Sequence, residues 1–235
     1  MVDVVVFDVD GTLVDSVDLH ARAWREALAH FGIELPYEEV RVHIGMGADQ
    51  LLPALVPAER LEEVAGPLSA FRERLYREAY RPQVSAFPAV RRLVARLRGE
   101  GKRVAVASSA KEDELAHYLR VAAIDDLVDA ATSAGDAYRT TPHPDVFEAV
   151  LDALGQPPRA ACRVVGATPW EATAAVRAGV VPVGVLCGGF PLEVLRRAGC
   201  AVIHRDPAAL LAAYEWHGDA ALGEEGFFEE VSDAP

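Results

Sequence analysis

The apolar residues of this chain follow two different rhythms. Residues 2–9 form a short, nearly continuous β-branched run, which is typical of a strand buried on both faces in a parallel sheet. From about residue 17 to residue 80 the apolar positions recur at helical spacing, and the first such stripe ends at Gly32. No strand pattern interrupts this stretch. We therefore expect one strand followed by a block of helices.

The chain after Pro82 alternates between the two patterns. Strands are expected at 103–107, 127–131, 163–165, 181–186 and 201–204. Helices are expected beside them, at 90–98, 112–120, 145–154, 171–178, 192–198 and 208–214. This alternation, with short connections, predicts an α/β fold in which a parallel sheet has helices on both faces. The helical block is then an insertion, so we expect a core of residues 1–15 and 82–214 and a helical cap of residues 16–81.

Composition narrows the classes of protein. The 235 residues carry a formal net charge of −13, which repels nucleic acid and anionic membranes. Three scattered cysteines fit reduced thiols in a cytoplasmic protein, and no apolar run is long enough for a signal peptide or a membrane span. Residues 215–235 contain seven acidic residues and no lysine or arginine, so we expect a solvated, mobile tail there.

Two carboxylates mark the end of the first strand. Asp8 and Asp10 lie at its carboxyl end and are followed at once by Gly11 and Thr12. Ligands of open α/β sheets bind outside the carboxyl ends of the strands, and strand alternation turns positions 8 and 10 to the same side. Two carboxylates this close need a cation between them, or one of them stays protonated. Mg²⁺ meets that need, and Gly11 allows a tight turn whose amides can face an anion.

The opening VVVFDVDGTLVDS resembles the signature of the haloacid dehalogenase-like superfamily, and the helical insertion after it resembles that of cap subclass I. The resemblance extends to about Tyr214 and implies a Rossmann-like core, Mg²⁺ as the cofactor and a phosphorylated substrate. It implies that Asp8 is the nucleophile that forms an aspartyl-phosphate, and that Asp10 is the general acid and then the general base. Both acids would also hold the metal, and Gly11 and Thr12 would contact the phosphate. The threonine at position 12 resembles the residue that the phosphatases of the family have in this motif, more than that of the sugar-phosphate mutases.

The segment VAVASSA, in which Ser108 ends a strand, resembles the second motif of that family. The hydroxyl of Ser108 and the amide of Ser109 can hydrogen-bond a phosphate oxygen, although a serine at this place is also an ordinary helix N-cap. Lys111 lies on the first turn of the next helix, where the helix dipole disfavours a cation. It is therefore either a phosphate ligand or a surface lysine.

Two further motifs depart from the family pattern. TTPHPDVF has Thr141 where the family has a lysine, and VVGATPWEA has Ala167 where the family has a metal-binding aspartate. One cation and one anion are lost together, so the fold should tolerate the change, whereas catalysis should be impaired. We hypothesise that Glu171, in place of a second acid, is the third metal carboxylate; alternatively, it stabilises a helix N-terminus. Lys111 and Arg139 are candidates for the missing positive charge.

The cap is expected to close over the phosphate and to select the substrate. His20, on the first cap helix, can bind substrate or pack at the hinge. RVHIGMGADQLL resembles the phosphoglycolate-phosphatase and β-phosphoglucomutase-like branch. Its candidate substrate contacts are Arg41, His43, Gly45 and Gly47. The cap has no lysine, which sets aside a Schiff-base mechanism, and its arginines are spaced like a solvated helix face: Arg60, Arg72, Arg74 and Arg77.

Three functions remain open at this point. The first is a Mg²⁺-dependent phosphatase of a small phosphorylated metabolite, slow because two motifs are damaged. The second is a catalytically inactive descendant that binds a phosphorylated ligand or a partner protein. The third is a phosphomutase-like transferase, which His20 favours and Thr12 opposes. In each case we expect a cytoplasmic monomer or weak homodimer with no nucleic-acid or membrane partner.

Overall fold

The computed structural model describes residues 1–223 and is built on a six-stranded parallel sheet in the order β5-β4-β1-β6-β7-β8. The strands are β1 (Val4–Phe7), β4 (Arg103–Ala107), β5 (Ala130–Thr132), β6 (Cys162–Gly166), β7 (Val181–Val185) and β8 (Val202–His204). β1 lies between β4 and β6, and Phe7 is paired with Val106 on one side and Val165 on the other. The residues that follow β1 therefore emerge near the middle of the sheet's carboxyl edge.

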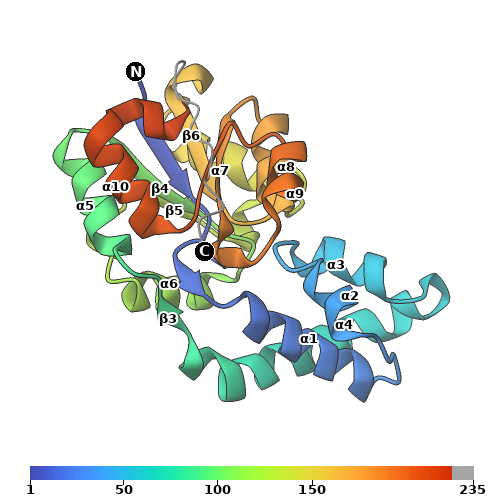
Figure 1. The fold of residues 1–235 in the computed structure, drawn as a ribbon. Helices are drawn as coiled ribbons and strands as arrows, with labels where there is room; N and C mark the ends of the chain where they lie inside the picture. Colours follow the sequence, from blue (N-terminus) through green and yellow to red (C-terminus); the bar gives the residue numbers. More distant parts are fainter. Residues whose placement is uncertain (224–235) are drawn as a thin grey trace.

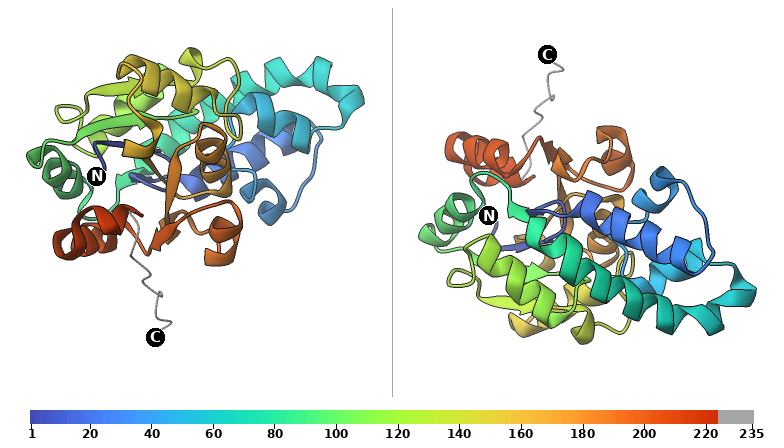
Figure 2. Two further views of the ribbon diagram at one scale, coloured as in Figure 1. Left: turned by 90° about the horizontal axis from the view of Figure 1, so that it is seen from above. Right: turned by 90° about the horizontal axis from the view of Figure 1, so that it is seen from below.

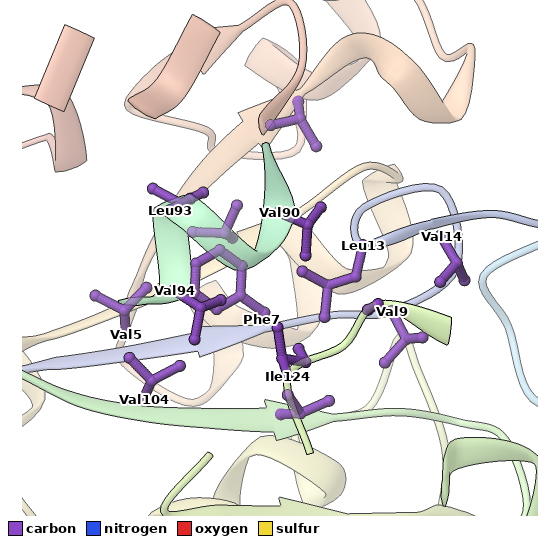
Figure 3. Close-up of a cluster of buried hydrophobic side chains, with 14 of the residues drawn as sticks. Val5, Phe7, Val9, Leu13, Val14, Val90, Leu93, Val94, Val104 and Ile124 are labelled. Carbon is purple, nitrogen blue, oxygen red and sulfur yellow. The ribbon is translucent and has the colours of Figure 1, made fainter. Parts of the chain in front are cut away.

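Alternation along β1 builds a hydrophobic core on each face of the sheet. Val5 and Phe7 join a buried cluster with helices α5, α6 and α10. Figure 3 shows these two side chains gathered with those of α5. Val4 and Val6 point the other way and join a second cluster with α7 and α8. Burial of each side chain of this size contributes about 1.5–3 kcal/mol, so both faces hold β1 in place.

The core helices cover the two faces of the sheet, with α5 and α10 on one side and α8 and α9 on the other (Figure 1). Their bounds are α5 (Val90–Gly99), α6 (Glu112–Val121), α7 (Asp145–Ala153), α8 (Pro169–Arg177), α9 (Leu192–Arg197) and α10 (Pro207–His217). The predicted fold class, a Rossmann-like parallel sheet with helices on both faces, is confirmed.

A helical insert, residues 17–83, lies beside the carboxyl edge of the sheet (Figures 1 and 2). It contains α1 (Val17–His30), α2 (Tyr37–Arg41), α3 (Ala48–Leu55) and α4 (Ala58–Leu75), and α4 runs on into a π-helical turn (Tyr76–Tyr80) and a 3₁₀ turn (Arg81–Gln83). The insert has its own buried cluster, which includes Trp24, Leu28, Leu51 and Leu68. It therefore has a core separate from those of the sheet.

The connection between the insert and the sheet is a two-stranded ribbon. β2 (Val14–Asp15) pairs antiparallel with β3 (Ser85–Ala86), so both chain crossings lie side by side. Two-residue strands carry no periodicity, which explains why the sequence pattern missed them. The boundaries proposed for the cap, 16 and 81, lie close to this ribbon and stay a prediction.

Two expected elements differ in position. β5 begins at Ala130 rather than near residue 127, because Asp129 bonds to the backbone of Val104 before the ladder starts. The solvated, mobile tail expected from residue 215 is wrong for the described residues 215–223, since α10 extends to His217 and a 3₁₀ turn buries Ala221 and Leu222. The remainder of that expected tail, residues 224–235, lies outside the described residues. Within residues 1–223 no helix is both long and apolar enough to cross a membrane.

Candidate active site

Asp8 and Asp10 line a common pocket between the carboxyl edge of the sheet and the helical insert. The pocket has a volume of about 370 Å³. Its lining includes Asp8, Asp10, Ser109, Lys111 and Thr140 from the core and His20, Trp24, Gly45, Gly47 and Arg72 from the insert. The central place of β1 explains this arrangement, because the strand's end delivers both acids to the face that the insert covers.

Asp8 is a buried carboxylate with little positive charge around it. Its side chain is 6% exposed and accepts a hydrogen bond from Thr12 Oγ1 at 3.2 Å. Burial, and then the charges of Glu171 and Asp10, raise the pKa of Asp8 well above its ordinary value. The ionised form therefore needs a cation, and the residues around it favour binding of one.

Asp10 has the opposite environment. Burial acts to raise its pKa, but the interaction and hydrogen bond of His20, the hydrogen bond of Ser16 and the charge of Arg72 outweigh burial and lower the pKa below its ordinary value. Ser16 Oγ and His20 Nε2 both bond to Asp10 Oδ1, the latter at 2.9 Å. The two neighbouring carboxyls therefore differ in acidity: Asp10 ionises more readily than Asp8, whose ionised form a nearby cation would stabilise.

His20 is held on four sides. Its ring stacks on Tyr76 with centroids 4.0 Å apart, and the Tyr118 hydroxyl lies 3.2 Å from its Nε2. Arg72 Nη2 bonds to Nδ1. A guanidinium carries donors and no acceptor, so Nδ1 accepts, and Nε2 carries the proton donated to Asp10. His20 therefore packs between insert and core and orients Asp10, and its contact with substrate stays a prediction.

The residues of the second motif have two kinds of contact, some with the pocket and one with the backbone. Ser109 and Lys111 line the pocket. Ser108 is 1% exposed, and its Oγ accepts the N–H of Ala110, which is the turn-stabilising role that a serine often has at this place. Lys111 Nζ lies 2.6 Å from Glu73 of the insert, so its charge is already paired. The phosphate-binding roles of these residues stay predictions.

The first-motif turn is shaped by close packing. Gly11 has φ +80°, and a Cβ there would lie 2.6 Å from Val17 and 3.0 Å from the backbone of Gly188. Ala167, at the position of the family's aspartate, is 0% exposed and touches this same packing. Neither Gly11 nor Thr12 lines the pocket.

Thr141, which stands where the family pattern has a lysine, forms a contact between core and insert. The Thr141 hydroxyl donates to the Gly45 carbonyl and lies 3.1 Å from Ser109 Oγ. Thr140 donates to Asp49 from its N–H, at 3.1 Å, and from its hydroxyl. Arg139, a candidate replacement for the lost charge, pairs instead with Asp145 at 3.5 Å.

Glu171 stabilises the start of α8. Its Oε2 accepts the N–H of Thr168 at 2.7 Å and the Thr168 hydroxyl accepts the N–H of Glu171, which together form a capping box. The same hydroxyl also accepts the N–H of Trp170. Burial raises the pKa of Glu171 to about 7, with a smaller contribution from the charge of Asp10, although its bonds to Thr168 act in the other direction. Of the two interpretations of Glu171, the helix-terminal one accounts for its contacts. Its role as a metal ligand stays a prediction.

The carboxylates fit a hydrated divalent ion only in part. Among residues 1–223 no three His, Cys, Asp or Glu side chains are placed to hold one ion together. Mg²⁺ is commonly bound through one or two carboxylates, with waters and substrate phosphate completing its shell. Asp8, whose charge is uncompensated, and Asp10 provide such a pair, and no third carboxylate is needed for that arrangement.

The insert loop after α2 reaches the core through glycines. A Cβ on Gly45 would lie 2.6 Å from Thr168 Oγ1 and 2.7 Å from Glu171 Oε1, and one on Gly47 would overlap the side chain of Thr140. Arg41 donates to the Gly188 carbonyl at 3.0 Å. His43 stacks beside Trp170, whose indole N–H donates to the Val42 carbonyl. Of these loop positions, Gly45 and Gly47 line the pocket, whereas Arg41 and His43 hold the insert against the core outside it.

The sequence pattern missed Arg72, and the expectation that all four cap arginines form a solvated face is wrong for it. Arg72 lies in i+4 register with Val64, Leu68 and Tyr76, which are all buried, so it belongs to the inner stripe of α4 and its continuation. Its guanidinium lies over the rings of Trp24 and Tyr76. The i+4 spacing is present in the sequence, but an arginine is usually exposed, so the spacing alone did not indicate a position on the inner stripe.

The chain is similar to known phosphatases and to a solved hydrolase structure. A phosphoglycolate phosphatase of Aquifex aeolicus is 29% identical over 194 residues, which cover 81% of this chain and 87% of that protein. A phosphoglycolate phosphatase of Yersinia pestis is 31% identical over 155 residues, covering 64% of this chain and 67% of that protein. The solved structure of a hydrolase from Pseudomonas syringae superimposes with a TM-score of 0.79 at 30% identity, covering 91% of this chain and 98% of that one.

A family model described as haloacid dehalogenase-like hydrolase matches residues 2–179. That match runs from the residues before β1 to the end of α8, and so includes both aspartates, the insert and the two altered motifs. Because it covers most of the 235 residues, the chain belongs to the haloacid dehalogenase-like hydrolase family.

Proposed function

We propose that this chain is a slow, Mg²⁺-dependent phosphatase that acts on a small phosphorylated metabolite in the cytoplasm. The observation that supports it most is that the two neighbouring acids of the first motif, Asp8 and Asp10, share one pocket at the carboxyl edge of the sheet. The phosphatase names of the relatives support the same reaction class.

Asp8 and Asp10 have different roles in the proposed reaction. The Asp8 carboxylate attacks the phosphorus, the bond from phosphorus to the leaving oxygen breaks, and Asp10 gives that oxygen a proton. Water then attacks the phosphorus of the aspartyl-phosphate, Asp10 takes the proton from that water, and Asp8 is released with inorganic phosphate. The donors on Asp10 Oδ1 favour its ionised form, which suits the second step directly. Its other oxygen remains the one for proton transfer.

Mg²⁺, when bound, would neutralise charge on the phosphoryl oxygens and relieve the repulsion around Asp8. Asp8 and Asp10 are the residues that would hold it, with water and substrate oxygens. The alanine at 167 and the threonine at 141 remove a carboxylate and a cation that the family pattern supplies. Changes of this kind typically cost about 10–100-fold each in metal affinity or activity, which is why we propose a slow enzyme.

The closed contacts around Thr141 favour a second candidate function. Thr141 bonds to Gly45 and Thr140 bonds to Asp49, so the insert is fastened to the core where a catalytic lysine would lie. A protein that binds a phosphorylated ligand without hydrolysing it would have the same features. We rank it second because both carboxylates of the first motif are retained.

Turnover of p-nitrophenyl phosphate, with and without Mg²⁺, tests the proposal. We expect phosphate release that depends on Mg²⁺ and falls at least about 1,000-fold in Asp8→Asn, which keeps the side-chain volume but loses the nucleophile. Equal turnover by wild type and Asp8→Asn would exclude the aspartyl-phosphate route. Absent turnover combined with saturable binding of phosphorylated ligands would select the second candidate.

A further inference from the structure

Four cationic side chains line the pocket, and they differ in how their charge is compensated. Lys111 lies 2.6 Å from Glu73, and Arg81 lies 3.6 Å from Asp113. Arg77 is exposed to solvent. Arg72 is partly buried and makes no ion pair with any carboxylate in residues 1–223. It is thus a partly buried pocket cation that no carboxylate of the described residues pairs with directly.

The contacts of Arg72 fix its direction but leave donors free. Nη2 bonds to His20 Nδ1, while Cζ lies 5.1 Å from the centroid of Trp24 and 4.7 Å from that of Tyr76. Nε is buried and has no hydrogen-bond partner in the described part of the chain. An unsatisfied buried donor is costly, and on a guanidinium the group that satisfies it best is an oxyanion. Arg72 therefore has the donor groups and the setting to bind an oxyanion in the pocket.

The contacts of His20 indicate which part of the substrate would lie near Arg72. One imidazole ring separates Arg72 from Asp10, since Nδ1 bonds to the arginine and Nε2 to the aspartate. In the proposed reaction the transferred phosphoryl group lies at Asp8, and Asp10 meets the oxygen of the leaving group. Arg72 belongs to α4 of the insert and lies across the His20 ring from Asp10, so we expect it to face the rest of the leaving group rather than the phosphoryl group.

We propose that Arg72 determines substrate choice by binding a second anionic group, a carboxylate or a second phosphate, on the leaving group of the substrate. The inference rests on the proposed function and adds the substrate class to it: short phosphoesters that carry a further oxyanion a few bonds from the ester oxygen. The rigid clamp of Trp24, Tyr76 and His20 favours this role because little side-chain freedom is lost when the anion binds.

Paired substrates test the assignment. Phosphoglycolate carries a carboxylate, ethylene glycol bisphosphate carries a second phosphate, and ethyl phosphate carries neither. For Arg72→Gln we expect kcat/KM to fall about 10–100-fold further for the preferred anionic substrate than for ethyl phosphate, the range of a charged hydrogen bond, and Arg72→Lys should recover part of it. The anionic substrate with the larger loss identifies the second group. Arg74→Gln, an exposed neighbour on α4, should change none of the three rates.

Equal losses for all three substrates would overturn the inference, since Arg72 would then act only through His20 and Asp10. Binding to Asp8→Asn gives a readout that does not need turnover. Calorimetric affinity for phosphoglycolate or the bisphosphate should fall about 10–100-fold when Arg72→Gln is added, and the affinity for ethyl phosphate should fall less. Absent hydrolysis with this binding difference intact would reject the proposed phosphatase and keep the anion site. Hydrolysis without this difference in affinity would support the proposed phosphatase and reject the anion site.

Discussion

Glu171 is a carboxyl group whose protonation should set part of the pH dependence of stability. Its pKa in the fold is raised to about 7 from an ordinary 4.5, so the folded state holds the proton where the unfolded state has lost it. The contribution of this group is therefore greatest below pH 4.5 and is lost as pH rises through about 7. We expect wild type to lose about 1–3 kcal/mol from this group between pH 5 and pH 8, measured by urea unfolding in metal-free buffer.

Glu171→Gln should remove most of that loss. The glutamine oxygen can still accept the Thr168 N–H, so the capping box is retained while the charge is removed. Glu148→Gln is the matched control, an exposed glutamate in the first turn of α7, and it should leave the pH profile of wild type in place. If Glu171→Gln and wild type lose stability in parallel, Glu171 stays ionised in the fold. Mg²⁺ titration of the same variant tests its role as a ligand, and undiminished affinity would reject that role.

At the scale of single residues the sequence predicted what the strand itself determines. Asp8 and Asp10 share a side because strand positions alternate, and no tertiary information is needed for that step. Glu171 finds its main partner within its own helix, since Thr168 is the N-cap of α8, whereas the contacts of Arg72 depend on the His20 ring that α1 brings to it. For Glu171 the sequence left a metal ligand and a helix-terminal acid as alternatives, and it assigned Arg72 to a solvated helix face, because an arginine is usually exposed unless a partner compensates it.

The loop between α2 and α3 is the element on which closure of the insert depends. Gly45 has φ +105°, and a Cβ there would lie within 2.7 Å of both Thr168 and Glu171 side-chain oxygens. Gly45→Ala should therefore displace the loop from the core, at a cost of about 1–3 kcal/mol in the free energy of unfolding, with a lower kcat/KM. The Trp170 indole bonds to the Val42 carbonyl of this loop, so its fluorescence should shift to the red.

Gly66→Ala is the matched control for that variant. Gly66 lies inside α4, and a Cβ added there would have no atom of another residue within 4 Å, so alanine should fit and raise helix stability by roughly 0.5–1 kcal/mol. Its fluorescence and turnover should equal those of wild type. A Gly45→Ala variant with unchanged turnover and unchanged Trp170 emission would mean that the loop is not needed against the core for activity.

At the scale of elements, periodicity predicted the helices and strands with bounds that are mostly within three residues. The pattern is strong there because both faces of the sheet are buried and each helix has one apolar stripe. It failed for β2 and β3, which are two residues long and exist because the chain leaves and re-enters the sheet at one place. It also failed for residues 218–222, where Ala221 and Leu222 are buried under neighbouring elements despite an acidic surrounding sequence.

For the whole molecule, the sequence predicted an insertion but not how the insert lies on the core. The contacts that fix its position are between residues far apart in the chain, such as Thr140 with Asp49 and Thr141 with Gly45. A threonine that replaces a lysine shows only that a charge is missing. Its new partner, a backbone carbonyl of the insert, becomes apparent only once the two units are placed together.

The bond between Thr140 and Asp49 should couple the stabilities of insert and core. Asp49 accepts both the N–H and the hydroxyl of Thr140, and Thr140 is 6% exposed, so water competes weakly for the hydroxyl. In a double-mutant cycle of Asp49→Ala and Thr140→Ala, measured by urea unfolding, we expect one cooperative transition and a coupling of about 0.5–1.5 kcal/mol. Glu59→Ala, an acid in the first turn of α4, should show no coupling with Thr140→Ala. If the two central changes add to within about 0.3 kcal/mol, the insert and the core are joined through the β2–β3 ribbon and not through this contact.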